Sequence, residues 1–228
     1  LKEFVSNKKE NEEIFDGITS RHVNAYYSTI VKGLSAKVFR TYLASSVVTK
    51  YLREHADIKS ESDMKKLFHA KLANLDAAIM CNHKRTIPKN FEASLQKKRD
   101  TLKTAEKTKP WEATQELLKK AESKTVKTEK LKEKQKERIK KIKATIKNRK
   151  VKHTERIEKL ELQVSLSEKT RDYNLGTSLR NYIDPRIFKT WTDEVGADWE
   201  KLYTSALQKK FLWVKDINSK WNEISKEY

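Results

Sequence analysis

Tyr182 occupies a position near the C-terminus where burial of a tyrosine is difficult. The segment 175–187 reads LGTSLRNYIDPRI, so Tyr182 follows a polar Gly-Thr-Ser stretch and precedes an Asp-Pro pair that interrupts any helix. The phenol is therefore either an ordinary core aromatic or a hydroxyl presented for chemistry. With an ordinary pKa of about 10, such a hydroxyl acts as a nucleophile only where cations stabilise the phenolate or a base takes its proton.

Two further residues carry the groups that such a nucleophile needs. Arg40 lies in the stretch GLSAKVFRTY and has a planar, permanently charged guanidinium that suits a phosphate. His83 lies in the stretch CNHKR beside Lys84 and Arg85, and its imidazole can donate to the same phosphate. Displacement at a phosphodiester builds negative charge on the non-bridging oxygens, and fixed donors aimed at those oxygens stabilise the transition state.

Each of these residues also has a structural interpretation. Arg40 would then be a surface arginine or part of an ion pair, and His83 a histidine that stabilises a helix C-terminus. The single cysteine, Cys81, excludes an intrachain disulfide, and the five histidines lack metal-ligand spacing, so a buried thiol and no metal site are expected. No glycine-rich phosphate loop is present, and no cofactor is expected.

The charge of the chain favours an extended polyanion as its partner. Its 228 residues include 51 Lys and Arg against 32 Asp and Glu, a formal charge of +19. Nucleic acid is the first candidate for such a partner, and an anionic membrane surface is a distant second. No apolar run reaches the roughly 18 residues of a membrane span, so we expect a soluble, intracellular protein. Because the chain begins with Leu1, we expect it to be part of a longer protein.

Helical spacing of apolar residues dominates residues 20–82. Ser35 is expected to cap a helix that ends near Glu54. A second helix is expected to end at Asn82 in a left-handed cap, which places His83 at its C-terminus. One face of this second helix contains Phe68, Leu72, Leu75 and Ile79.

Residues 91–170 are strongly basic, with 25 basic and 13 acidic residues and no glycine. A narrow apolar seam with charge elsewhere predicts a two-helix antiparallel coiled coil. Pro110 is expected to kink or restart the first helix, and the chain is expected to reverse near residues 123–128. The seam consists of Leu95, Leu102, Ile139, Ile142, Ile146, Ile157, Leu160 and Val164.

The last segment, from about residue 171, is helical and aromatic. Asp184 and Pro185 predict the start of a helix that ends before Gly196, and Asp198 is expected to cap the next one. The aromatic residues either form a small core or pack on the first segment. They are Trp191, Trp199, Tyr203, Phe211 and Trp213.

The short turn that carries Tyr182 needs a cap of its own. Thr177 or Ser178 is expected to cap it, and Pro185 prevents the turn from continuing.

The stretches GLSAKVFRTY, CNHKR and LGTSLRNYIDPRI, in this order and spacing, resemble the C-terminal part of the type IB DNA topoisomerases of the eukaryotic kind. In that family an AKVFRTY helix carries a catalytic arginine and a CNHxR loop carries a catalytic histidine. A basic coiled-coil linker follows, and a C-terminal domain carries the nucleophilic tyrosine in an SKxxY context. The matching residues are Arg40, His83 and Tyr182, and the resemblance covers essentially the whole chain.

The resemblance implies an all-α fold in three parts. Residues 1–90 would form the C-terminal part of a catalytic core, and residues 91–170 a protruding antiparallel coiled-coil linker. Residues 171–228 would form a small helical C-terminal domain with the active-site tyrosine.

The resemblance also implies a reaction. Tyr182 would attack a DNA phosphodiester and form a 3′-phosphotyrosyl intermediate, while Arg40 stabilises the transition state and His83 donates to a phosphate oxygen. The strand with the free 5′-OH would rotate to relax supercoils and then be religated, without ATP or an obligatory metal.

The chain departs from the family pattern beside the tyrosine. The family's lysine after the serine is Leu179 here, with Arg180 one place later, so the role of that lysine is not carried over. Asn181 matches an asparagine that contacts camptothecin-class inhibitors in drug-sensitive members. The candidates for contact with DNA or an inhibitor are Asn181, Lys84, Arg85, Thr177 and Arg180.

The expected partner is double-stranded DNA, preferentially supercoiled, with no role for a membrane. The family's further catalytic arginine and its lysine general acid lie upstream of anything in this chain, so a core domain on the same or a partner chain is expected. Without that acid, residues 1–228 alone should be inactive or nearly so. We expect the full protein to be a monomer on chromosomal DNA, in the nucleus if eukaryotic and in the nucleoid or cytoplasm if prokaryotic.

Two other functions fit parts of the sequence. Tyrosine recombinases or integrases use the same arginine, histidine and tyrosine, but a basic insertion of about a hundred residues between His83 and Tyr182 is not expected in them. A non-enzymatic coiled-coil DNA-binding protein explains the charge, but it gives no reason for the three motifs.

Overall fold

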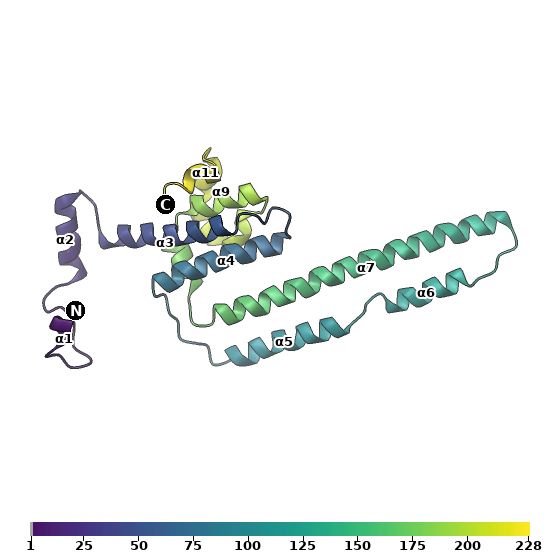
Figure 1. Ribbon diagram of the computed structural model, residues 1–228, viewed down its shortest axis with the longest axis horizontal. Coiled ribbons are helices and arrows are strands. Elements are labelled where there is room, and N and C mark those ends of the chain that lie inside the picture. Colours follow the sequence, from purple (N-terminus) through teal and green to yellow (C-terminus); the bar gives the residue numbers. More distant parts are fainter. Residues whose placement is uncertain (1) are drawn as a thin grey trace. The chain divides into compact units, whose positions relative to one another are not determined.

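The computed structural model describes residues 2–228, and this part of the chain is all-α, with no β-strand (Figure 1). None of the described helices combines the length and the apolar character needed to cross a bilayer. The α-helices are α1 (Lys2–Val5), α2 (Ser20–Ile30), α3 (Ala36–Glu54), α4 (Asp63–Met80), α5 (Phe91–Lys107), α6 (Glu112–Glu122), α7 (Glu129–Lys169), α8 (Leu175–Asn181), α9 (Pro185–Val195), α10 (Ser205–Lys210) and α11 (Trp221–Ile224). Two 3₁₀-helices are η1 (Trp199–Leu202) and η2 (Leu212–Asp216).

The described residues form two compact units. Unit 1 combines residues 2–61, His69–Lys84 and Tyr173–Tyr228, and unit 2 combines Ser62–Phe68 and Arg85–Asp172. Unit 1 therefore contains both the first and the last helices of the chain. The division into three domains expected from the sequence stays a prediction.

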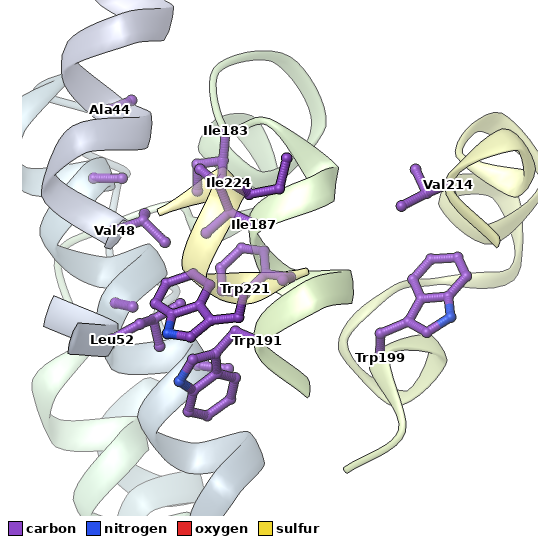
Figure 2. Packing of buried hydrophobic residues seen from close by; sticks show 14 of the residues in the cluster. Ala44, Val48, Leu52, Ile183, Ile187, Trp191, Trp199, Val214, Trp221 and Ile224 are labelled. Carbon is purple, nitrogen blue, oxygen red and sulfur yellow. The ribbon is translucent and has the colours of Figure 1, made fainter. Parts of the chain in front are cut away.

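A hydrophobic core joins α3 and α4 to the C-terminal helices of unit 1. Figure 2 shows Trp191 of α9 and Trp221 of α11 beside Leu52 of α3. Trp191 and Leu52 are completely buried, and burial of a large apolar side chain contributes about 1.5–3 kcal/mol. Of the aromatic residues expected to pack here, Trp191 thus lies against the first segment, whereas Trp199 and Phe211 lie edge to face with Tyr203. Trp213 is the exception, because it is 51% exposed.

Helix α4 contributes to this core mainly through small residues. Ala70, Ala73 and Ala77 are buried, whereas Ile79 on the face expected from the sequence is 47% exposed. The distance between packed helices depends on the side chains at their contact, and alanine allows a close approach. The expected apolar face of α4 was therefore wrong at Ile79.

The end of α4 confirms the expected left-handed cap at Asn82, where φ is 53°. The N–H of Asn82 donates to the carbonyl of Ile79 at 2.9 Å, and the N–H of His83 donates to the carbonyl of Ala78 at 2.8 Å. This pair of bonds is the Schellman arrangement, which reverses the chain direction at a helix end. His83 follows the cap directly, as expected.

Helix α8 begins earlier than expected. Its N-cap is Asn174, whose side chain accepts a hydrogen bond from the N–H of Gly176 at 2.9 Å. The expectation that Thr177 or Ser178 caps this turn was wrong, because both residues lie inside α8. Asparagine caps a helix as well as serine does. Because Asn174 lies one turn before the expected cap, α8 starts earlier and Tyr182 is its C-cap.

Asn74 of α4 holds α8 through two buried hydrogen bonds. Its Nδ2 donates to the carbonyl of Leu175 at 3.0 Å, and its Oδ1 accepts from the hydroxyl of Ser178 at 2.6 Å. Asn74 is 4% exposed and Ser178 is completely buried. A buried polar group without its partner costs about 1–3 kcal/mol, so these two bonds fix α8 against α4.

Both ends of α9 agree with the sequence expectations. The Asp184 side chain accepts from the N–H of Arg186 at 2.9 Å, and Pro185 takes the first helical position. Gly196 ends the helix with φ of 70°, a conformation that glycine adopts without a Cβ clash. Asp198 caps η1 by accepting from the N–H of Glu200.

Unit 2 is a helical hairpin in which α5 and α6 pack along α7 (Figure 1). The chain reverses between α6 and α7 at residues 123–128, and the first arm is interrupted at Pro110, both as expected. At this interruption Arg149 Nη1 donates to the Pro110 carbonyl at 3.1 Å and to the Thr114 hydroxyl at 2.6 Å. The interlocking of side chains that defines a coiled coil stays a prediction.

The two ends of this hairpin lie side by side. The Arg85 N–H donates to the Asp172 carbonyl at 3.0 Å, and Arg85 Nε donates to the Arg171 carbonyl at 2.9 Å. Farther along the arms, Arg99 forms an ion pair with Glu168 at 2.6 Å. Because this pair is exposed, it contributes at most about 1 kcal/mol.

We predict that Asn74→Ala destabilises unit 1, because it removes both side-chain hydrogen bonds from α4 to α8 and leaves the Ser178 hydroxyl only its 3.1 Å bond to the Leu175 carbonyl within α8. The expected cost is about 2 kcal/mol, or a fall in Tm of about 4–8 °C. Scanning calorimetry would measure it, with the exposed Asn222→Ala as the control. Equal Tm values for the two variants would contradict the role given to Asn74.

Candidate active site

Tyr182 lies at the end of α8, half-buried, with its ring against two of the predicted site residues. Its ring centroid is 5.0 Å from that of His83, with an angle of 41° between the planes. The Arg40 Cζ lies 5.8 Å from the same centroid. Among the described residues, no group forms a hydrogen bond with the Tyr182 hydroxyl. The structure therefore brings Arg40, His83 and Tyr182 together in unit 1.

Two cations of α3 face this ring. Lys37 lies one turn before Arg40, and its Nζ is 5.9 Å from the Tyr182 ring centroid. Within residues 2–228, neither Lys37 nor Arg40 forms an ion pair or donates a side-chain hydrogen bond. The structural interpretation of Arg40 as part of an ion pair is therefore wrong for the described chain. Two unneutralised positive charges beside a phenol are suited to bind an anion there.

The surroundings of His83 favour its neutral imidazole. Burial lowers the pKa of His83, and the positive charge of Arg40 lowers it further. Its Nδ1 is buried and has no hydrogen-bond partner among the described residues. A neutral imidazole still donates one N–H, so His83 offers a phosphate a donor without adding a third positive charge.

Backbone and buried polar contacts hold these three residues. The His83 carbonyl accepts from the Asn174 N–H at 2.8 Å, which ties the loop after α4 to the start of α8. The completely buried Ser45 of α3 accepts from the Asp184 N–H at 3.1 Å. The segment that carries Tyr182 is thus joined to the helix that carries Arg40 and to the loop that carries His83.

The other predicted contact residues lie in different settings. Asn181 and Arg180 end α8 and are exposed, and Thr177 is half-buried in the same helix. Lys84 is exposed and its backbone pairs with that of Tyr173 in an isolated bridge. Arg85 belongs to unit 2, where its guanidinium is bonded to the Arg171 carbonyl.

The sequence alone did not identify three residues that hold or extend the site, namely Lys37, Asn74 and Ser45. Lys37 had a detectable signal, because residues three apart share a helix face and Arg40 was already a candidate. Asn74 and Ser45 had no such signal, since a polar residue in a helical pattern is usually exposed.

A metal centre is not indicated in the described part of the chain. No group of three or more potential metal-binding side chains occurs among residues 2–228. Cys81 is buried, as expected, and burial raises the pKa of its thiol, with a smaller opposing effect from Arg40. The thiol form of Cys81 is therefore favoured, and the residue belongs to the core.

The site as a whole can hold an oxyanion against a hydroxyl nucleophile. Arg40 offers a two-pronged donor, His83 a neutral donor and Lys37 a point charge, all around the Tyr182 ring. Donors fixed before the reaction stabilise developing negative charge without the cost of reorganising solvent.

Comparison with known proteins agrees with this arrangement. The family model described as eukaryotic DNA topoisomerase I, catalytic core, matches residues 1–117, and the C-terminal topoisomerase domain matches residues 154–223. DNA topoisomerase 1 of Rattus norvegicus is 33% identical over 225 residues, which are 95% of this chain and 27% of the rat protein.

Two other relatives give similar values. DNA topoisomerase 1 of Drosophila melanogaster is 32% identical over 213 residues, 93% of this chain and 19% of the fly protein. The rat protein named DNA topoisomerase I, mitochondrial, is 32% identical over 213 residues, 93% of this chain and 34% of that relative. The chain thus spans 19–34% of the length of these three relatives.

The first family model covers half of the chain and contains Arg40 and His83, and the second contains Tyr182. These matches do not support the recombinase and the non-enzymatic coiled-coil interpretations. The chain therefore belongs to the eukaryotic DNA topoisomerase I family.

Proposed function

We propose that the protein containing this chain is a type IB DNA topoisomerase, which cleaves one strand of duplex DNA, lets it rotate and religates it without ATP. The observation that carries this proposal is the pair of unneutralised cations, Arg40 and Lys37, beside the Tyr182 ring. The neutral donor His83 on the same ring completes a set that fits a phosphodiester.

In the proposed reaction the Tyr182 oxygen attacks a backbone phosphorus. A new bond forms between the tyrosine oxygen and phosphorus, and the bond from phosphorus to the 5′ oxygen breaks. The phenol gives up its proton to solvent water, and the departing 5′ oxygen takes one from a general acid that the family resemblance places upstream of this chain. The phosphotyrosyl ester retains the bond energy of the phosphodiester, so the reverse attack by the 5′-OH religates the strand without ATP.

Arg40 and His83 have different parts in this step. Arg40 donates to the non-bridging oxygens as negative charge grows on them, and its charge persists at any working pH. His83 donates one hydrogen bond as a neutral imidazole, because its lowered pKa keeps it unprotonated near pH 7. Lys37 contributes positive potential beside the Tyr182 ring that attracts the phosphate.

The remaining candidates would act on DNA around the cut. Asn181, Arg180 and Lys84 are exposed and available for contact with DNA or an inhibitor, while Thr177 and Arg85 are partly engaged in the fold. We propose that the protein acts on chromosomal DNA in the nucleus, and we expect a monomer that prefers supercoiled duplex.

The basic hairpin of unit 2 would contact phosphates without reading sequence. Its excess charge is spread over exposed lysines and arginines, and such contacts release counterions and weaken as salt rises. This hairpin would therefore affect the rotation of the DNA more than the cleavage step.

We predict that Tyr182→Phe abolishes the covalent protein–DNA adduct while DNA affinity changes by less than about twofold, because a phenyl ring keeps the packing but has no nucleophile. Denaturant trapping on supercoiled plasmid, without ATP or magnesium, followed by gel electrophoresis would measure the adduct. Tyr173→Phe, the nearest tyrosine in sequence, is the matched control. An adduct formed by Tyr182→Phe would refute the role of this residue.

We predict that, in the absence of DNA, the pKa of His83 lies below the ordinary histidine value of 6.5. Arg40→Gln should raise the midpoint only in part, because burial is the larger cause of the lowered pKa. Between pH 6.5 and the lowered pKa of His83, the folded protein binds fewer protons than the unfolded chain. The free energy of unfolding should therefore fall as the pH drops through this range.

NMR of ring-labelled histidine would follow this titration, with Arg53→Gln at the other end of α3 as the control. A His83 midpoint at or above 6.5 would contradict the neutral-donor role.

We predict that replacing residues 91–170 by a short flexible connection leaves the cleavage rate within about threefold but makes relaxation less processive and less sensitive to salt. The bonds between Arg85 and residues 171 and 172 bring the two ends close enough for such a connection. Relaxation time courses across a salt series would show the change. Complete loss of cleavage would mean that the hairpin is structurally required by the site.

A further inference from the structure

A second polar cluster lies two residues after Tyr182, at Asp184. Besides capping α9, the Asp184 carboxylate accepts two hydrogen bonds from the Arg186 guanidinium, at 2.8 and 2.6 Å, and one from the Tyr228 hydroxyl at 2.8 Å. Arg186 is also paired with Glu227 at 2.7 Å. The Asp184 side chain is only 13% exposed, so these bonds lie largely out of water.

Tyr228 joins this cluster to the helix that carries Arg40. Its ring packs against Tyr42 of α3 with 5.8 Å between the ring centroids, and its hydroxyl reaches Asp184. Tyr42 lies two residues after Arg40, and Asp184 lies two residues after Tyr182. Tyr228 therefore spans the same two segments that carry the nucleophile and its principal donor.

The Asp184 backbone has a separate bond to α3, at Ser45. That bond and the buried neighbours Ile183 and Pro185 hold the main chain of the segment. The Tyr228 contact acts on the Asp184 side chain and adds a second link from this segment to α3, through Tyr42. Burial and the charge of Asp184 raise the pKa of Tyr228 to about 12, so its hydroxyl stays a donor at working pH.

We propose that Tyr228 is a positioning residue of the active site, which acts through Asp184 to hold Tyr182 at its distance from Arg40. This inference rests on the proposed function. Small displacements of a nucleophile are costly in enzymes, because the reacting atoms must approach in line at close range. A loose Asp184 segment would slow attack on phosphorus without removing any group that binds DNA.

The test is single-turnover cleavage by the full-length protein of a DNA substrate that traps the covalent adduct. Tyr228→Phe removes one oxygen and keeps the ring on Tyr42. We expect the cleavage rate to fall by about tenfold, with DNA affinity and Tm close to those of the unsubstituted protein. Tyr26→Phe, which removes the hydroxyl of a tyrosine that is 65% exposed on α2, is the matched control and should leave the rate unchanged.

A double-mutant cycle tests the route through Asp184. Asp184→Ser keeps a residue that caps α9 but is too short to reach Tyr228. If Tyr228 acts through Asp184, adding Tyr228→Phe to Asp184→Ser should lower the rate no further. Fully additive losses would overturn the proposed route.

The remaining outcomes separate this inference from the proposed function. A Tyr228→Phe variant that cleaves at the unsubstituted rate, or that loses rate only together with Tm and DNA affinity, would overturn the positioning role and leave the proposed function intact. Absence of any adduct with the unsubstituted full-length protein would overturn the proposed function, and this inference with it.

Discussion

A guanidinium can remain beside a phenol without a carboxylate partner where water still solvates it, because hydration offsets the cost of an unpaired charge. Arg40 meets this condition at Tyr182, and Lys37 adds a second unpaired charge. An acidic neighbour would have neutralised the charge and removed the affinity for phosphate. Partial exposure keeps Arg40 hydrated, so the unpaired charge does not carry the cost of a buried ion.

The residues around the site form a chain of buried polar contacts. Helix α8 has only seven residues and is too short to be stable alone, so its position depends on Asn74 and on the Ser45 contact beyond Tyr182. The large aromatic core supplies the burial that makes these bonds strong, because water cannot replace a lost partner inside it. Core packing and active-site geometry are therefore coupled in unit 1.

The two units use charge in different ways. In unit 1 a few cations are aimed at one ring, and the neutral state of His83 avoids a further repulsion with Arg40. In unit 2 many exposed charges are spread along α5, α6 and α7, and the ion pairs between the arms are individually weak. Fixed local charge suits transition-state stabilisation, whereas dispersed surface charge suits salt-dependent contact with a long polyanion.

The sequence alone determined the features that depend on neighbouring residues. The helix ends at Asn82 and Gly196, the cap at Asp184 and the break at Pro110 follow from local backbone preferences. The motifs likewise identified Arg40, His83 and Tyr182 as candidates.

Only the tertiary structure decided which helix faces are buried and which distant side chains meet. Ile79 and Trp213 are exposed, Lys37 faces Tyr182, and Asn74 is buried beneath α8. These outcomes depend on contacts between residues from 101 (Asn74 and Leu175) to 145 (Lys37 and Tyr182) positions apart, and periodicity carries no information about such partners.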